Sequence, residues 1–148
     1  MVWFQELLAN RVLWSALLAS LVAQGTKLLL VYGRSGKLDI RVVTQTGGMP
    51  SSHAALVSAL ALGVGMQEGW DSLLFAATVV FALIVMYDAA GIRQAAGKHA
   101  RVLNRMMESF EDAEFEEPSL KELLGHTPLQ VVVGSLLGVS CILLSRLF

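Results

Sequence analysis

Charged side chains are scarce in this sequence. Only 16% of its 148 residues are Asp, Glu, Lys or Arg, whereas roughly 25% are charged in a typical soluble domain. Hydrophobic residues make up 55% of the chain, and the mean hydropathy is +0.61. This composition argues against a soluble globular protein and predicts an integral membrane protein in contact with membrane lipid.

Features typical of several other classes are also absent. A formal net charge of −1, without a stripe of aromatic and basic residues, argues against a nucleic-acid partner. The single cysteine, Cys141, excludes an internal disulfide. No tight spacing of His, Cys and Asp suggests a metal site, so we expect neither a metal nor another cofactor.

Four apolar segments are present, and a membrane-spanning helix needs about 20 apolar residues. The segments cover residues 12–32, 50–66, 73–87 and 129–148. Helical spacing of apolar residues after the third segment predicts an amphipathic helix, which either continues that segment or lies along the membrane surface. We therefore expect an all-α membrane bundle of one domain (1–148), with about four spanning helices, the amphipathic helix and a cytoplasmic loop at about 88–126.

Local signals predict where the helices begin. Pro50 suits the first turn of the second segment, where its missing N–H costs nothing. Asp71 or Ser72 can cap the third segment. Thr127 and Gln130 form a capping-box pattern at the start of the fourth segment.

The distribution of Lys and Arg predicts the orientation. If all four segments cross the membrane, the loops 33–49 and 88–126 share one side, which holds eight of these residues against two on the other side. By the positive-inside rule the first side is cytoplasmic, and both termini lie outside. His53 and His126 then lie beside helix N-termini on the cytoplasmic side. Helix N-termini favour anions, so these ends together with nearby Lys and Arg predict a phosphate site.

Three stretches carry a resemblance to a known family: "KLLLVYGR" (27–34), "PSSH" (50–53) and "GHTPLQVVVG" (125–134). They resemble a divergent branch of the type 2 phosphatidic acid phosphatase family, which is related to the vanadium-dependent haloperoxidases. The three motifs of that family are Lys-x6-Arg-Pro, Pro-Ser-Gly-His and Ser-Arg-x5-His-x3-Asp. The resemblance covers most of the chain, including residues 85–98.

The resemblance implies a membrane phosphatase that acts on a lipid phosphate or pyrophosphate from the cytoplasmic face of the cell membrane. His126 would attack phosphorus and form a phosphohistidine, and His53 would protonate the leaving oxygen. The residues implied to hold the phosphate oxygens are Lys27, Arg34, Ser51, Ser52 and Arg93.

The sequence also departs from the family's motifs. Arg34 is followed by serine rather than proline, Ser52 replaces the glycine, and Gln130 stands where an aspartate would orient the nucleophile. The Ser-Arg pair is missing, and Arg93 or Lys121 would have to replace its arginine. About four spanning helices replace the usual six or so, which leaves open that a homo-oligomer encloses the site.

Each candidate residue has a structural alternative. Gln130 can cap its helix with Thr127, and Ser51 and Ser52 can satisfy first-turn backbone groups. Lys27 can extend its ammonium group to the membrane interface. Asp88, assigned a supporting role at the site, can instead form a structural ion pair with Arg93.

Two other functions compete with the phosphatase hypothesis. The first is a non-catalytic relative that binds anionic lipid headgroups or serves as a membrane assembly partner. The second is an ion or metal transporter that uses His53, His126 and Asp88.

Overall fold

The computed structural model describes residues 2–37, 39–41, 47–109, 119–122 and 124–147. Within these ranges the regular structure is helical and no strand occurs, which confirms the predicted all-α class. The helices are α1 (Val2–Ala9), α2 (Arg11–Ser35), α4 (Ser52–Glu68), α5 (Leu73–Tyr87), the π-helical turn η1 (Asp88–Ile92), α6 (Arg93–Glu108) and α7 (Pro128–Ser145).

Three helical stretches in the described part of the chain are long and apolar enough to cross a membrane. They are α2, the 36-residue run formed by α5, η1 and α6, and α7. Helix α4 has 17 residues, which is near the lower end of the spanning range of about 17–25 residues. The expectation of about four spans agrees with this set of helices.

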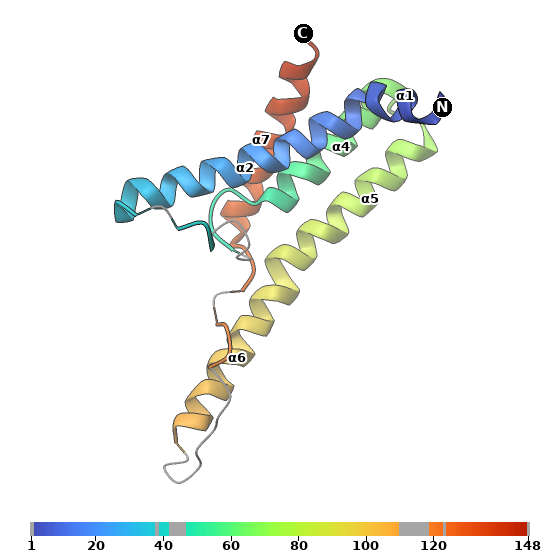
Figure 1. The fold of residues 1–148 in the computed structure, drawn as a ribbon. Coiled ribbons are helices and arrows are strands. Elements are labelled where there is room, and N and C mark those ends of the chain that lie inside the picture. The colour runs from blue at the N-terminus through green and yellow to red at the C-terminus, as the bar shows by residue number, and fades with distance from the viewer. Residues whose placement is uncertain (1, 38, 42–46, 110–118, 123, 148) are drawn as a thin grey trace.

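Helix α4 lies at the centre of the bundle, between α2, α5 and α7 (Figure 1). Small residues let it approach its neighbours, since Ala55 of α4 and Ala16 of α2 belong to one buried cluster. Gly134 and Gly138 of α7 pack directly against the backbone of α4, where a β-carbon would collide with the carbonyls of Ser51 and Ala55. Such close backbone contacts are typical of packed membrane helices.

The third segment continues directly into the amphipathic helix. Figure 1 shows α5 and α6 as one long run, interrupted only by η1. A 36-residue helix is about 54 Å long, whereas the hydrocarbon core of a bilayer is about 30 Å thick. Helix α6 therefore extends the run beyond a single membrane crossing, and Val102, Leu103 and Met106 form an exposed apolar face on it.

The predicted start of the second segment was wrong by two residues. Helix α4 begins at Ser52, and Pro50 precedes the N-cap instead of occupying the first turn. Ser51 is the N-cap because its hydroxyl accepts a hydrogen bond from the Ala54 N–H at 3.3 Å. Of the two residues proposed to cap α5, Ser72 is the cap.

Candidate functional site

The N-termini of α4 and α7 meet at one place. The Ser51 N–H donates to the Gln130 carbonyl over 3.1 Å, which joins the first turns of the two helices. His53 lies in the first turn of α4, and His126 immediately precedes the N-cap of α7. Their ring centroids are 6.4 Å apart, with the ring planes inclined by 61°. The two predicted histidines are therefore brought together by helix packing.

A backbone bond and a ring bond hold His126, and the Gln130 side chain also acts on its ring. The His126 N–H donates to the Ala89 carbonyl of η1 at 2.8 Å, and its ring Nδ1 lies 3.1 Å from the Gly48 carbonyl. A carbonyl oxygen can only accept, so Nδ1 carries the hydrogen in this bond. In the neutral ring Nε2 then keeps its lone pair, which is the arrangement a nucleophilic imidazole needs.

The surroundings of His126 favour the neutral ring. The residue is only 4% exposed. Burial is the main cause that lowers the pKa of His126 below its ordinary value of 6.5, and the charges of His53 and Lys27 act in the same direction. The hydrogen bonds of His126 to Gly48 and to the Gln130 side chain oppose this shift without reversing it. His126 is therefore neutral at pH 7.

Two cations stand close to the histidines. Lys27 of α2 is 6% exposed, its stem lies against Gly48, and its charge acts on both imidazoles. Arg93 donates from Nε to Asp88 Oδ2 over 2.7 Å. Both members of this ion pair act electrostatically on His53. The predicted Asp88–Arg93 pair thus forms at the edge of the histidine pair, at the junction of η1 and α6.

The remaining predicted residues are placed differently. Ser51 is fully buried and serves as a helix cap, as one of the two interpretations of the sequence predicted. The Ser52 hydroxyl accepts a hydrogen bond from Gln24 Nε2 at 3.2 Å. Arg34 is exposed near the end of α2 and is not among the charges that act on either histidine. Lys121 is exposed in the segment before α7.

Gln130 forms the predicted capping box. Its Oε1 accepts from the Thr127 N–H at 3.0 Å, and its own N–H donates to Thr127 Oγ1 at 3.4 Å. The oxygen at His126 Nδ1 belongs to the Gly48 backbone, and the Gln130 side chain also acts on the His126 ring.

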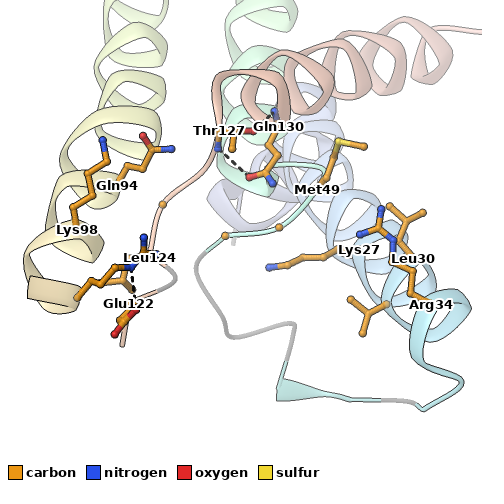
Figure 2. Close-up of a pocket in the computed structure, with 15 residues that line it drawn as sticks. Lys27, Leu30, Arg34, Met49, Gln94, Lys98, Glu122, Leu124, Thr127 and Gln130 are labelled. Carbon is orange, nitrogen blue, oxygen red and sulfur yellow. Dashed lines mark hydrogen bonds and ion pairs between the residues drawn. The ribbon is translucent and has the colours of Figure 1, made fainter. Parts of the chain in front are cut away.

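A cavity of about 630 Å³ opens beside the histidine pair, between α2, α6 and the segments that precede α4 and α7 (Figure 2). The histidines themselves do not line it. Gly48 does, and its carbonyl accepts the bond from His126, so this peptide separates the cavity from the His126 ring. The charged lining residues are Lys27, Arg34, Lys98, Arg101 and Glu122.

Several of these positions were not predicted from the sequence. The only signal for Gly48 was its place in the glycine pair before Pro50, and Gln24 is an isolated polar residue in an apolar segment. Lys98 contributed only to the charge count of its loop. Its place in the cavity wall depends on α6 continuing α5 in a straight run.

Comparison with known proteins agrees with this architecture. The family model described as "Divergent PAP2 family" matches residues 8–141. The chain belongs to the divergent PAP2 family. The resemblance noted in the three stretches is therefore confirmed, and this divergent PAP2 protein is a membrane protein. A relative is the uncharacterized membrane protein YuiD of Bacillus subtilis strain 168, which is 44% identical over 146 residues, 90% of this chain and 92% of the relative. No solved structure matches the chain.

Proposed function

We propose that this divergent PAP2 protein hydrolyses a lipid phosphate or pyrophosphate through a phosphohistidine on His126. The observation that carries the proposal is the 6.4 Å separation of the His53 and His126 rings, combined with the Nδ1 bond that leaves Nε2 of His126 unprotonated. One imidazole can then attack phosphorus while the second protonates the leaving oxygen.

The proposed reaction has two steps. In the first, His126 Nε2 forms a bond to phosphorus, the bond from phosphorus to the lipid oxygen breaks, and the proton of His53 moves to that oxygen. In the second, water attacks phosphorus, the bond from phosphorus to His126 Nε2 breaks, His53 takes the water's proton, and inorganic phosphate leaves. His126 and His53 return to their starting protonation states, so atoms and charges balance.

The nearby cations support phosphoryl transfer. Negative charge accumulates on the phosphoryl oxygens, and preorganised cationic groups stabilise that charge. Lys27 and Arg93 are the two cations whose charge acts on the histidine pair. Arg93 acts electrostatically on His53, whereas Lys121 is exposed and is not among the charges that act on either histidine, so Arg93 is the better replacement for the arginine missing from the third motif.

The same site supports a second candidate function, which is binding of an anionic lipid headgroup without turnover. The Gly48 carbonyl is uncharged, so it cannot stabilise an imidazolium as a carboxylate would. In either case the site lies at the cytoplasmic face in the orientation that the positive-inside rule predicts.

The test is phosphate release by purified protein in lipid vesicles that contain phosphatidic acid or a prenyl diphosphate. We expect turnover by the wild type, inhibition by the phosphate analogue vanadate, and loss of about 10³-fold or more in His126→Asn, which keeps a donor for the Gly48 carbonyl. The matched control is His99→Ala, because His99 is an exposed histidine on α6 outside the site.

The wild type should form a phosphorylated protein whose phosphate is lost in acid, as expected of a phosphohistidine. This species should be absent in His126→Asn. Turnover that persists in His126→Asn would overturn the proposed mechanism. Retained binding of lipid phosphate without turnover in the wild type would favour the binding function.

A further inference from the structure

We infer that the π-helical turn η1 positions the proposed nucleophile, His126, and places the Arg93 cation beside the histidine pair. Ala89 of this turn and Gly125, which packs against it, are then positioning residues, because they act on the reaction through His126. The catalytic part of the inference rests on the proposed function, whereas the placement of the His126 ring does not depend on it.

The backbone of η1 makes the Ala89 carbonyl available. In an α-helix each carbonyl accepts a hydrogen bond from the N–H four residues later. The Arg93 N–H instead donates to the Asp88 carbonyl, five residues earlier, which is the π-helical pattern. The Ala89 carbonyl thereby loses its α-helical partner and accepts from the His126 N–H at 2.8 Å. The π-helical turn therefore creates the acceptor that holds the His126 backbone.

The same turn accounts for the ion pair beside His53. Successive residues of an α-helix are rotated by about 100°, so side chains five positions apart point about 140° away from each other. Asp88 and Arg93 are five positions apart, yet Arg93 Nε lies 2.7 Å from Asp88 Oδ2. The wider π-helical turn brings these two positions toward one face, because its hydrogen bonds join residues i and i+5. Both charges act on His53, so η1 places partner groups for both histidines.

The helix that follows His126 does not by itself fix the His126 backbone. His126 precedes Thr127, the N-cap of α7, so its torsion angles lie outside the helical turn. The segment before it has no regular secondary structure in the described residues 119–122 and 124–126. The bond to Ala89 and the packing of Gly125 therefore hold His126 from its N-terminal side.

Gly125 allows the segment to approach η1 closely. Its φ is +82°, and an added β-carbon would lie 2.7 Å from the Gln94 N atom and 3.1 Å from the Ala89 carbonyl oxygen. These are backbone atoms, which cannot move aside as the end of a flexible side chain can. Ala89 and His126 are both buried, so the contact is enclosed. A side chain at position 125 must therefore push the segment away from η1 and move His126 with it.

The experiment compares Gly125→Ala with the matched control Gly36→Ala. Gly36 also has a positive φ, +65°, but an added β-carbon there would have no neighbour within 4 Å, so the control carries the backbone strain without the collision. In Gly125→Ala we expect kcat for phosphate release to fall about tenfold to hundredfold, as for a misplaced nucleophile. KM should change less than about twofold, because Lys27 on α2 is not displaced. Gly36→Ala should leave both constants unchanged.

The ring nitrogens of His126 provide a readout that does not need turnover. Nitrogen NMR of histidine-labelled protein in detergent reports which ring nitrogen carries the hydrogen, and the signals that disappear in His126→Asn are those of His126. The wild type and Gly36→Ala should carry the hydrogen on Nδ1, as the bond to the Gly48 carbonyl requires. Gly125→Ala should show a mixture of the two tautomers, because the displaced ring loses this bond.

Two further measurements apply if Gly125→Ala does not fold. Gly125→Asn keeps the collision, but asparagine adopts a positive φ more readily than alanine does, and it should show the same loss of kcat and the same change of tautomer. Hydrogen exchange of the wild type needs no variant, and the His126 amide should be protected by its bond to Ala89. Exchange of this amide at the rate of an unstructured peptide would overturn the inference.

The inference also fails if Gly125→Ala keeps the kcat and the tautomer of the wild type, or if Gly36→Ala loses as much activity. If the wild type turns over lipid phosphate and Gly125→Ala does so equally well, the inference fails and the phosphatase function stands. If the wild type shows no turnover while Gly125→Ala alone changes the His126 tautomer, the phosphatase function fails and η1 stands as the element that positions His126.

Discussion

The Nδ1 atom of His126 and the carbonyl oxygen of Gly48 lie 3.1 Å apart, and this contact fixes the hydrogen of the imidazole on Nδ1. Gly48 belongs to the segment before α4, whereas His126 precedes α7. The bond therefore orients His126 only when the two helix starts are packed together. A backbone oxygen thus sets the orientation and the tautomer of the His126 ring.

The first prediction concerns Gln130. Because Gly48 already occupies His126 Nδ1 and Gln130 caps α7, Gln130→Asp should change phosphate release less than about threefold, or roughly 0.7 kcal/mol. Gln130→Ala should lower stability by about 1 kcal/mol through loss of the cap. Turnover assays and thermal unfolding measure the two effects. The Gln130 side chain already acts on His126, so a tenfold gain in Gln130→Asp would show that a carboxylate at this position activates the nucleophile in spite of the bond to Gly48.

The second prediction concerns Gly48. Its φ is +84°, and an added β-carbon would lie 2.8 Å from Cε of Lys27. Gly48→Ala should therefore displace the lysine and weaken phosphate release or headgroup binding by at least about tenfold, besides costing about 1–2 kcal/mol for the left-handed backbone.

Gly36→Ala is the matched control for this substitution. Gly36 also has a positive φ, +65°, but an added β-carbon there would have no neighbour within 4 Å. We expect a similar loss of stability and little change in activity. Equal activity losses in the two variants would show that backbone strain, and not the contact with Lys27, explains the effect of Gly48→Ala.

The third prediction concerns pH. The folded state lowers the pKa of His126 below 6.5, chiefly through burial, so the unfolded chain takes up a proton on this residue at a higher pH than the folded chain does. The contribution of His126 to stability is therefore fully present above about pH 6.5 and is lost as the pH falls toward its folded pKa. Thermal unfolding in detergent between pH 7.5 and pH 5 should show this loss, and His126→Asn should reduce it.

The fourth prediction concerns Asn104 of α6, whose side chain forms hydrogen bonds to the segment before α7. Its side chain donates to the Leu120 carbonyl and accepts from the Leu120 N–H, both at 2.9 Å, and the residue is 7% exposed. Asn104→Ala should cost about 1–3 kcal/mol because these buried groups lose their partners. Cleavage by trypsin after Lys121 should accelerate, as followed by mass spectrometry. Arg105→Ala, an exposed neighbour, should leave the rate unchanged.

The fifth prediction concerns orientation. In a Cys141→Ala background, a cysteine introduced by Ser109→Cys should react with a membrane-impermeant maleimide only after the cells are permeabilised. A cysteine introduced by Glu68→Cys, at the opposite end of α4, should react in intact cells. The positive-inside charge distribution is the physical reason. The reverse labelling pattern would show that the candidate site faces outward.

The sequence by itself determined the elements whose signals are local. The bounds of α5 follow from a continuous apolar run between Ser72 and Asp88, and the start of α7 follows from the Thr127–Gln130 capping box. Hydrogen bonds and apolar runs within a few residues produce both features. The bounds of α5 and the start of α7 can therefore be predicted from the sequence without knowledge of the rest of the fold.

Only the tertiary structure decided how the site is assembled. Counting the membrane crossings could assign His53 and His126 to one membrane face. The 6.4 Å separation of their rings, however, depends on Gly134 and Gly138, which allow α7 to pack against α4. The Gly48 carbonyl carries no sequence signal, because every residue has a backbone carbonyl. Its role as the partner of His126 arises from packing between segments far apart in the chain, and such contacts have no local period that a sequence could reveal.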